Sequence, residues 1–423
     1  MMRSNRGVSA ATRMIEMFNI AWVAGLVVGL SGGLARADEP APPSTVTVEY
    51  QADDATANLQ SALDSGASVV RIPYVGQHWI TRPLAMRDKT MLVLDPGVVL
   101  MAKKGEYKDP HDAVITAERV KEVAIIGGPG SRIEMHKADY LNEEEYPVGE
   151  WRHCICLKGV ERAQVKGLML ASSGGDGLYV GPTWDDDRIP CKNITATHNE
   201  YVNNTRQGLS VIAAVNSYFG QSRITGTSGR APQAGIDIEP GSPRDPIDVT
   251  LEDWHVVDNQ GSGLLVVLDR TDPESTINVL ARRFCIQGTR QAAIRMKSDA
   301  DRSADGRVVI SDFVIERIQH EGLKVEQWNI GTNFDVKLEY VRMADVGRNV
   351  DFPVTFSFMG ESQGEGAMLI SDSILYDLVR REKIGAATVG ETIAPLTGRL
   401  DVVTLSSRSA ALPWARDFAL SYR

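Results

Sequence analysis

The sequence predicts an all-β fold, a single-stranded parallel β-helix with an N-terminal capping helix, and three observations support this prediction. The 423 residues include 38 glycines and only 6% aromatic side chains, which favours many turns and small stacked side chains over a helical bundle. The apolar segments are short and bounded by glycine or proline, without a helix-length periodic segment between them. A glycine-plus-aliphatic pattern also recurs at a nearly constant spacing, which is typical of a solenoid.

The first 37 residues are predicted to form a secretory signal peptide. Arginines precede an apolar run from Ile20 to Leu34, and the small-residue stretch ARA at 35–37 follows it. The run is short for a bilayer span and contains four glycines, so cleavage after Ala37 is preferred over a stable membrane anchor. We therefore expect a secreted or periplasmic protein, with a polar, proline-containing linker at 38–45.

The predicted β-helix domain covers residues 46–384 and begins with the capping helix. In ADDATANLQSALDSG, Asp53 or Asp54 can cap a short helix that places Leu59 and Leu63 on one face. The segments SVVRIP, DKTMLVLDPGVVLMA and VKEVAIIGGPGSRIEM follow as short strands.

The repeat becomes clear from residue 176 onward. Strands such as DGLYVG, QGLSVI, AGIDIE and SGLLVV place a small residue at their second position, with spacings of 31, 27, 28, 30 and 29 residues. The residues at this position are Gly177, Gly208, Gly235, Gly263, Ala293 and Gly322. Coils of this length without amphipathic helices fit a parallel β-helix, and they exclude ankyrin and tetratricopeptide repeats. The less periodic residues 385–423 are expected to cap the last coils or to form a tail.

The chain resembles the pectate-lyase-like superfamily of right-handed parallel β-helices, which includes polygalacturonases, pectate lyases and phage tailspikes. The resemblance rests on the opening DDATANLQSALDSGASVVRIP and on NNTRQGLSVIAA followed by GTSGRAPQAGIDIEP, and it covers residues 46–384. It implies the right-handed fold and a substrate that lies on one outer sheet. It does not specify the reaction, because this fold hosts hydrolases, lyases, epimerases and binding spikes.

Strand alternation predicts which side chains face outward from the repeated strands. If the aliphatic positions face inward, the residues between them form two outward columns. The first column is Tyr179, Ser210, Asp237, Leu265, Arg295 and Lys324, and the second is Gly181, Ile212, Glu239, Val267, Lys297 and Glu326. Asp176, Arg206 and Gln207 directly precede or begin these strands. The loops TWDDDRIPC and ADYLNEEEYPVGEW are expected to wall one side of this surface.

The acidic residues of this surface are the predicted catalytic groups. Residues two apart on a strand are about 6.5–7 Å apart, so Asp237 and Glu239 can act as the carboxyl pair of an inverting glycosidase. We expect Glu239 to be the acid and Asp237 the base, although the roles can be reversed, and Asp176 can replace either. The predicted substrate-binding residues are Arg206, Gln207, Tyr179, Arg295, Lys297 and Lys324. Their cations favour an anionic polysaccharide as substrate.

Two other functions remain open at this point. In a polysaccharide lyase, Asp237 and Glu239 would hold Ca²⁺ while Arg206, Arg295 or Lys297 serves as base, and a C5-epimerase would use similar groups. The absence of a lysine a few residues after Glu239 weakens the match to one lyase family. In a noncatalytic carbohydrate-binding β-helix, Tyr179, Trp184 and the basic residues would hold a glycan. The hydrolase needs no cofactor and no metal.

Composition limits the partners further. A net charge of −10 and a pI near 5.3 argue against nonspecific nucleic-acid binding, which needs a broad basic surface. The four cysteines lack metal-ligand spacing and are expected to be buried thiols. Asn199, Asn203 and Asn204 are predicted to satisfy backbone groups at a corner of the coil. The sequence makes no prediction of the oligomeric state.

Overall fold

A computed structural model describes residues 44–272, 274–298, 304–329 and 334–350, together with the strand segments 354–359, 368–371, 374–377, 382–383 and 386–388. These residues belong to one compact unit. The predicted signal peptide, nearly all of the linker and nearly all of the predicted C-terminal cap lie outside the described residues. None of the helices in the described ranges is long and apolar enough to cross a membrane.

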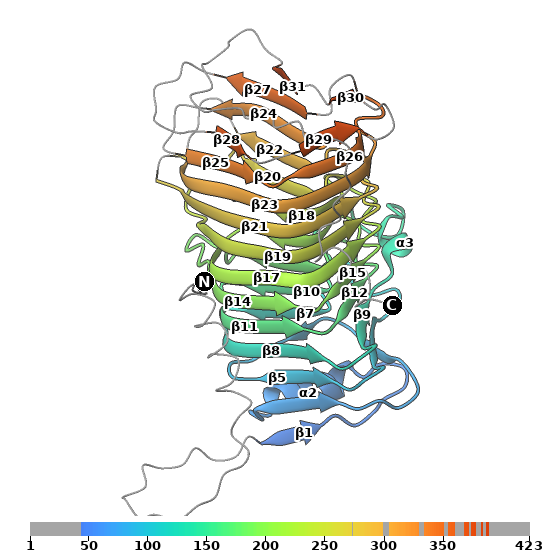
Figure 1. Cartoon of the computed structure of the whole chain (residues 1–423). Coiled ribbons are helices and arrows are strands. Elements are labelled where there is room, and N and C mark those ends of the chain that lie inside the picture. Colours follow the sequence, from blue (N-terminus) through green and yellow to red (C-terminus); the bar gives the residue numbers. More distant parts are fainter. Residues whose placement is uncertain are drawn as a thin grey trace, which may run out of the picture. The chain divides into compact units, whose positions relative to one another are not determined.

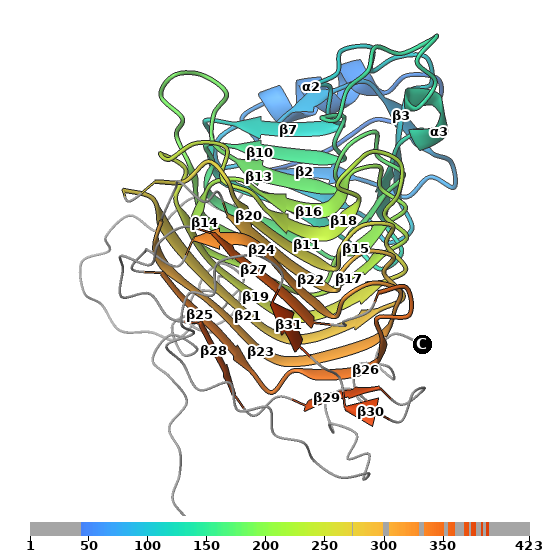
Figure 2. The same cartoon turned by 90° about the horizontal axis from the view of Figure 1, so that it is seen from above.

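One face of the coils is a parallel sheet that carries the predicted outward columns, here called sheet B (Figure 2). Its strands, in spatial order, are β4 (Leu84–Ala85), β7 (Ile115–Glu118), β10 (Ile155–Lys158), β13 (Leu178–Gly181), β16 (Gln207–Val211), β18 (Ala234–Ile238), β20 (Leu264–Leu268), β22 (Ile294–Ser298), β24 (Leu323–Asn329), β27 (Val354–Met359) and β31 (Ala386–Thr388). Each strand pairs in parallel with the strand one coil away, as a β-helix requires.

The other strands form sheet A, which has two parallel rows. The first row contains β1 (Thr45–Thr47), β2 (Val69–Ile72), β5 (Met91–Leu94), β8 (Lys121–Gly127), β11 (Glu161–Lys166), β14 (Cys191–Thr197), β25 (Phe334–Glu339) and β28 (Met368–Ser371). The second row contains β3 (Trp79–Thr81), β6 (Val99–Ala102), β9 (Arg132–Glu134), β12 (Met169–Ala171), β15 (Glu200–Val202), β26 (Arg342–Val346) and β29 (Ile374–Asp377). β30 (Glu382–Lys383) pairs with β29 in antiparallel orientation.

Four long strands join these two rows, as Figure 1 shows. They are β17 (Ala214–Thr225), β19 (Ile247–Val257), β21 (Thr276–Gln287) and β23 (Asp305–Ile318). β17, for example, pairs with both β14 and β15 of the preceding coil. One left-handed residue bends the chain between the rows in each coil, at His198, Gln221, Asp253, Arg283 and Asp312, with φ between 51° and 58°. Each coil therefore presents three strand faces.

The predicted capping helix is present as α2 (Thr56–Asp64). Leu59 and Leu63 are buried on its inner face, as expected, and Asp54 accepts a hydrogen bond from the backbone N–H of Thr56 at 3.1 Å. The side chain of Gln60 exchanges two hydrogen bonds of 2.9 and 3.1 Å with the backbone of Ala85 in β4. The helix thereby satisfies the edge of the first strand of sheet B, which would otherwise be open to pairing.

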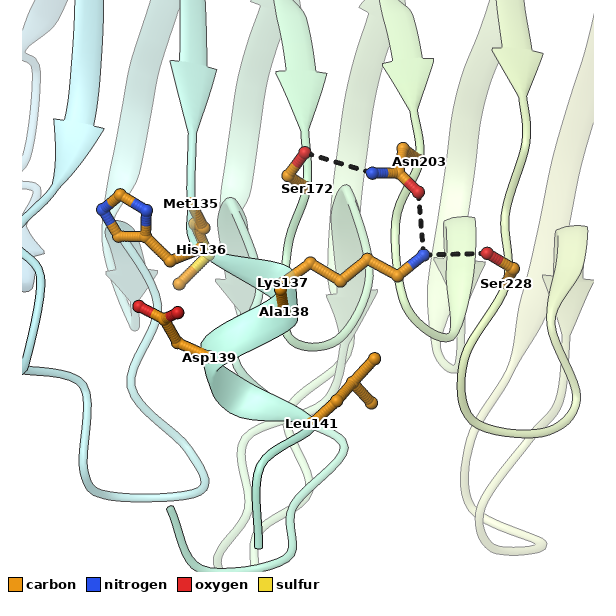
Figure 3. Close-up of a pocket in the computed structure, with 9 residues that line it drawn as sticks. All are labelled: Met135, His136, Lys137, Ala138, Asp139, Leu141, Ser172, Asn203 and Ser228. Carbon is orange, nitrogen blue, oxygen red and sulfur yellow. Dashed lines mark hydrogen bonds between the residues drawn. The ribbon is translucent and has the colours of Figure 1, made fainter. Parts of the chain in front are cut away.

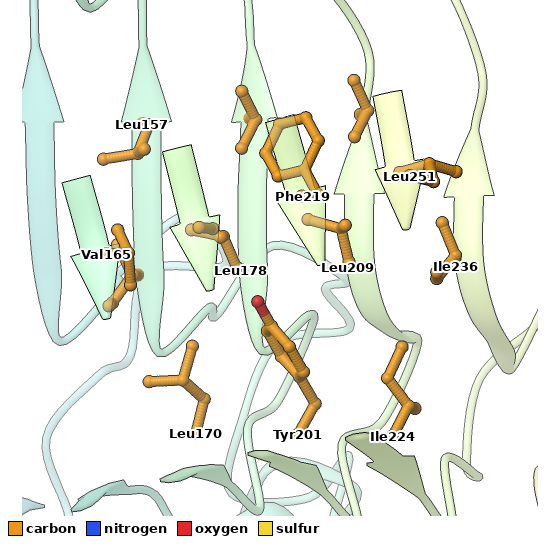
Figure 4. Close-up of a cluster of buried hydrophobic side chains, with 14 of the residues drawn as sticks. Leu157, Val165, Leu170, Leu178, Tyr201, Leu209, Phe219, Ile224, Ile236 and Leu251 are labelled. Atoms are coloured by element: carbon orange, nitrogen blue, oxygen red, sulfur yellow. The ribbon is translucent and has the colours of Figure 1, made fainter. Parts of the chain in front are cut away.

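The interior is a continuous apolar core, and all three strand faces contribute side chains to it. Figure 4 shows Leu178, Leu209 and Ile236 of sheet B directed toward side chains of sheet A. An aromatic ladder connects β15, β19, β21 and β23, with Tyr201, Trp254, Phe284 and Phe313 at centroid distances of 5.8, 6.5 and 4.4 Å. The strand β17 lies between β15 and β19. These contacts replace the helix packing that other solenoids use.

Buried asparagine side chains bind backbone groups at the corners of the coil. This confirms the prediction for two of the three asparagines, Asn199 and Asn204. The side chain of Asn199 bonds the N–H of Leu168 and the carbonyl of Val165, and that of Asn204 bonds the N–H of Ser173 and the carbonyl of Leu170. Asn203 instead binds a lysine side chain. Buried turn backbone is thus satisfied by side chains from the next coil.

The cysteines are free thiols, as expected. Cys154, Cys156 and Cys191 are buried, and Cys285 is half-buried. Burial raises the pKa of the Cys191 thiol to about 12.

Candidate functional site

The outward columns predicted from strand alternation are present in sheet B. In the first column Tyr179 pairs with Ser210, Ser210 with Asp237, and Asp237 with Leu265. It continues through Arg295 to Lys324. In the second column, the register aligns Val267, Lys297 and Glu326. The aliphatic positions between them all belong to the buried core, so the strand frame is confirmed.

The acidic residues are less accessible than an outward column suggests. Asp237 and Asp176 are both fully buried, and only Glu239 is partly open, with a side chain that is 28% exposed. Gln207, expected to bind substrate, is also fully buried and donates from Nε2 to Oδ2 of Asp237 at 2.8 Å. Its backbone N–H donates to Oδ1 of Asp176 at 3.1 Å. Gln207 therefore connects the two buried carboxyls.

Arg206 lies among the carboxylates. Its guanidinium is 3.3 Å from Oε2 of Glu150, 3.5 Å from Oε2 of Glu239 and 3.9 Å from Oδ2 of Asp176. The side chain is only 13% exposed. One cation thus links a glutamate of the 141–152 loop to two carboxyls predicted to be catalytic.

A buried histidine completes the cluster, and the sequence did not reveal it. Nδ1 of His153 accepts the backbone N–H of Asp176 at 3.0 Å, so the proton of the neutral ring is on Nε2. Burial and the positive charge of Arg206 lower the pKa of His153 well below its usual range. Its ring stacks on Tyr179 with centroids 5.0 Å apart. Tyr179 is buried beneath this contact and is not free to bind substrate in this arrangement.

Unpartnered polar atoms concentrate around these residues. Among the described residues, the buried side-chain atoms that lack a hydrogen-bond partner within the protein include Nε2 of His153, Oε1 of Gln207 and Oδ1 of Asp237. Native proteins pair most buried polar groups, so such a cluster requires a specific explanation. Adjacent unused donors and acceptors are what a binding or catalytic site supplies to a polar ligand.

The electrostatics of the two buried carboxyls are altered in the same direction. Burial raises the pKa of Asp176 to about 7, although Arg206 opposes the effect. Burial and the nearby charge of Glu239 raise the pKa of Asp237 well above its usual range, again opposed by Arg206. Both groups can therefore carry a proton near neutral pH, and perturbed carboxyls of this kind are typical of functional sites.

Two loops that follow sheet B strands bind each other beside Glu239. Arg188 of the 182–190 loop pairs with Asp245 of the 240–246 loop, and its Nε donates at 2.9 Å. Arg244 also donates to the backbone carbonyl of Asp186 at 3.1 Å. The loops start from β13 and β18, so this contact bridges the intervening coil. The predicted TWDDDRIPC loop therefore does build one border of the surface.

The predicted cationic flank is neutralised. Arg295 and Lys324 each lie 2.6 Å from a carboxylate oxygen of Glu326, and Lys297 pairs with Asp269. The expectation of free cations facing an anionic substrate is therefore not met at these three positions. Glu326 belongs to the predicted second column, beside Lys324, whereas Asp269 directly follows β20 and was not part of either column.

A separate pocket of about 480 Å³ lies at α3 (Lys137–Tyr140) and contains none of the predicted site residues. Nζ of Lys137 donates to Oδ1 of Asn203 and Oγ of Ser228, each at 2.9 Å (Figure 3). It also donates to the carbonyl of Asn204 at 3.3 Å. All three donors of the ammonium group are occupied, so Lys137 ties α3 to two successive coils.

The described residues contain no group of three or more metal-ligating side chains that could hold an ion. The Ca²⁺ hypothesis needs carboxylates that converge on a cation. Here the guanidinium of Arg206 already contacts Glu239 and Asp176, and Asp237 binds Gln207. This arrangement does not fit a calcium site.

Comparison with known proteins identifies the fold. No protein-family model and no curated protein sequence matches the chain. Among solved structures, the polygalacturonase from Erwinia carotovora ssp. carotovora is 15% identical with a TM-score of 0.53, over 84% of this chain and 99% of that one. A hyperthermoactive exopolygalacturonase from Thermotoga maritima is 13% identical with a TM-score of 0.55, over 79% and 87%.

The tailspike protein of E. coli bacteriophage HK620, solved as a double mutant in complex with pentasaccharide, is 11% identical with a TM-score of 0.58, over 81% of this chain and 60% of that one. These similarities confirm the predicted fold, a right-handed parallel β-helix. At such low identity they establish the fold and leave the reaction to the site itself.

Proposed function

We propose that this protein is a polysaccharide-active glycoside hydrolase whose carboxyl pair is Asp237 and Glu239. The observation that carries the proposal is the cluster of unpartnered polar atoms around Asp237, together with its raised pKa. Solved relatives by fold include two polygalacturonases and a tailspike bound to a pentasaccharide, which supports a sugar polymer as the substrate class. The predicted signal peptide at 1–37 supports export to the periplasm or beyond.

The environment of each carboxyl suggests the roles. We expected Glu239 to be the acid, but Asp237 is the group whose pKa is raised by burial, so it is better suited to hold a proton at neutral pH. Glu239 is partly open and lies beside Arg206, which suits a base that activates water. Glu239 directly follows β18, two residues after Asp237, and a spacing of this kind is compatible with the carboxyl separation of an inverting enzyme.

Catalysis by Asp237 requires its Oδ1 to become accessible when a sugar enters. Arg206 is the side chain placed to respond, because it is held by ion pairs of 3.3–3.9 Å. A substrate hydroxyl that binds Arg206 in place of Glu239 would release the guanidinium from the Glu239 carboxylate. The released carboxylate would then be free to orient water.

Asp237→Asn and Glu239→Gln test this proposal. Each should lower kcat by about 100- to 10,000-fold, because general acid or base catalysis is lost. The measurement is reducing-end release on a panel of neutral and acidic polysaccharides, with NMR of the first product to record the anomeric configuration. Asp248→Asn, at an exposed position of β19 in sheet A, is the matched control and should keep wild-type turnover.

The alternatives give different results in the same assay. A lyase would form an unsaturated uronate product and lose activity on chelation, whereas the hydrolase should do neither. The noncatalytic binder is favoured by one observation, the complete burial of Asp237 and Asp176. For a binder, no polysaccharide would be cleaved by the wild type, and that outcome would overturn the proposed function.

A further inference from the structure

An aromatic cluster lies at the end of the first outward column, and the proposed mechanism does not use it. Of its residues only Trp184 was among the predicted glycan contacts, for the noncatalytic alternative. It is formed by His111, Trp151 and Trp184 from three separate loops. The ring of His111 stacks on Trp151 with centroids 4.8 Å apart and an interplanar angle of 1°. The same ring meets Trp184 at 5.0 Å and 66°.

Specific contacts hold this cluster against the candidate site. Nε1 of Trp184 donates to Oη of Tyr179 at 3.2 Å, and Nζ of Lys158 lies 4.1 Å from the centre of the Trp184 ring. Tyr179 in turn stacks on His153, which contacts Asp176. An unbroken chain of contacts therefore connects the aromatic cluster to the buried carboxyls.

The two tryptophans are exposed although they are fixed in place. Trp151 is 37% exposed and Trp184 is 40% exposed. Large apolar side chains held open to solvent by hydrogen bonds and stacking are a feature of binding surfaces, because no core packing accounts for their position. Their flat, electron-rich faces suit the C–H groups on the face of a sugar ring.

We propose that Trp151, His111 and Trp184 form a subsite that binds an uncharged sugar residue of the polysaccharide. The inference rests on the proposed function, since it assumes that the sugar chain crosses sheet B. Tyr179, which carries the cluster, is two strands from Asp237, or about 9.6 Å along the stack. A chain positioned for cleavage at Asp237 can therefore extend across Tyr179 to the tryptophans.

The charges around the cluster select against an anionic sugar. Asp109 lies 3.1 Å from Nδ1 of His111. Asp185 and Asp187 flank Trp184 on the same loop, and both share the single cation Arg119. Lys158 is paired with a glutamate at 2.8 Å. A uronate would approach an excess of negative charge here, whereas an uncharged ring meets no such penalty.

Affinity gel electrophoresis tests the subsite by binding alone. The protein carrying Asp237→Asn, which prevents digestion, is run through gels that contain β-1,3-glucan, glucomannan, xylan, dextran, polygalacturonate or alginate. At least one neutral polysaccharide should retard it. Adding Trp151→Ala or Trp184→Ala should weaken the apparent affinity about tenfold, because the stacking surface is lost.

Matched controls separate this effect from unfolding and from failure of the enzyme hypothesis. Tyr74→Ala removes a residue that is 60% exposed and outside the cluster, and it should leave retardation unchanged. Circular dichroism verifies that each variant is folded, and Trp184→Phe should retain most of the affinity. Retardation by acidic gels only, by no gel, or equally in the tryptophan variants would overturn the subsite. Because turnover is not measured, a wild type that cleaves no polysaccharide would overturn the proposed function while leaving this binding test valid.

Discussion

At the scale of single residues, the candidate site is defined by the carboxyl groups of Asp176 and Asp237, which are buried away from solvent. Asp176 is fully buried between the backbone N–H of Gln207 and the ring of His153. Its carboxylate is near Arg206, but the ion pair spans 3.9 Å, which does not compensate for desolvation. The pKa of Asp176 is therefore raised, and the stability of the folded protein should depend on pH through this group.

Asp176→Asn should change the pH dependence of unfolding. The pKa of Asp176 rises from its usual 3.8 to about 7 in the folded protein, so the native state binds more protons than the unfolded chain between these values. This contribution to stability is present at low pH and is lost as the pH rises toward 7. Asparagine keeps an oxygen for the N–H of Gln207 and removes the titration.

The free energy of unfolding of the variant, relative to wild type, should therefore increase by on the order of 3 kcal/mol between about pH 4 and pH 8. Urea denaturation at several pH values measures it. Equal pH dependence in the two proteins would show that Asp176 is not the buried acid described here.

Strand alternation predicted the direction of Asp237 and Glu239 but not the burial of Asp237. The alternation depends only on the backbone, and it follows from aliphatic neighbours such as Ile236 and Ile238. Burial depends on contacts between coils, such as that of Asp237 with Gln207 of the neighbouring strand, and local sequence does not specify these contacts. His153 has no local motif at all, because it meets Asp176 only through coil stacking.

At the scale of the elements, the small residue that marks each repeat is required by contact with the next coil. A Cβ at Gly235 would lie 2.5 Å from Cγ1 of Val256 and 2.7 Å from the carbonyl oxygen of Gly263. Gly177, Gly208 and Gly263 show similar distances to the following coil. The periodic glycine was therefore a reliable signal because it reports close approach of strands, not flexibility.

Gly235→Ala should destabilise the protein by about 1–3 kcal/mol, because the added methyl group forces the neighbouring coil to shift. Thermal or urea unfolding measures the change. Ala293→Gly is the matched control at the same position of a later repeat, and it should cost only about 0.5–1 kcal/mol through backbone entropy. A neutral Gly235→Ala would show that the coil spacing adapts more easily than the contacts indicate.

At the scale of the whole domain, stability is distributed along the stack, since each strand pairs only with its neighbours. The repeat and the coil content were sufficient to predict this architecture. The joining of two strand rows by the long strands β17 to β23 was not predicted, because left-handed corner residues such as Arg283 and Asp312 have no distinctive sequence pattern.

A substitution in the aromatic ladder tests whether stability is distributed along the stack of coils. Trp254→Ala should cost about 3–5 kcal/mol, because it opens a cavity between Tyr201 and Phe284 and leaves the carbonyl of Phe219 without its 3.0 Å hydrogen bond. Hydrogen exchange should accelerate mainly in β15 to β21, while β5 and β8 keep their protection. Trp254→Phe should show a smaller effect, and uniform acceleration throughout would contradict nearest-neighbour coupling.

The 182–190 and 240–246 loops, which bind each other through Arg188 and Asp245, can vary in length without disturbing the strands of the coil. Both loops begin after a sheet B strand and lead into the next strand of sheet A. β14 pairs with β11 in constant register, and the register shift between β17 and β19, located between Ala214 and Ser217, ends before Val249. Exchange of a loop for one of different length therefore leaves the stacked scaffold in register. The residues of these two loops that contact a substrate can therefore be exchanged or can diverge while the stacked coils keep the same structure.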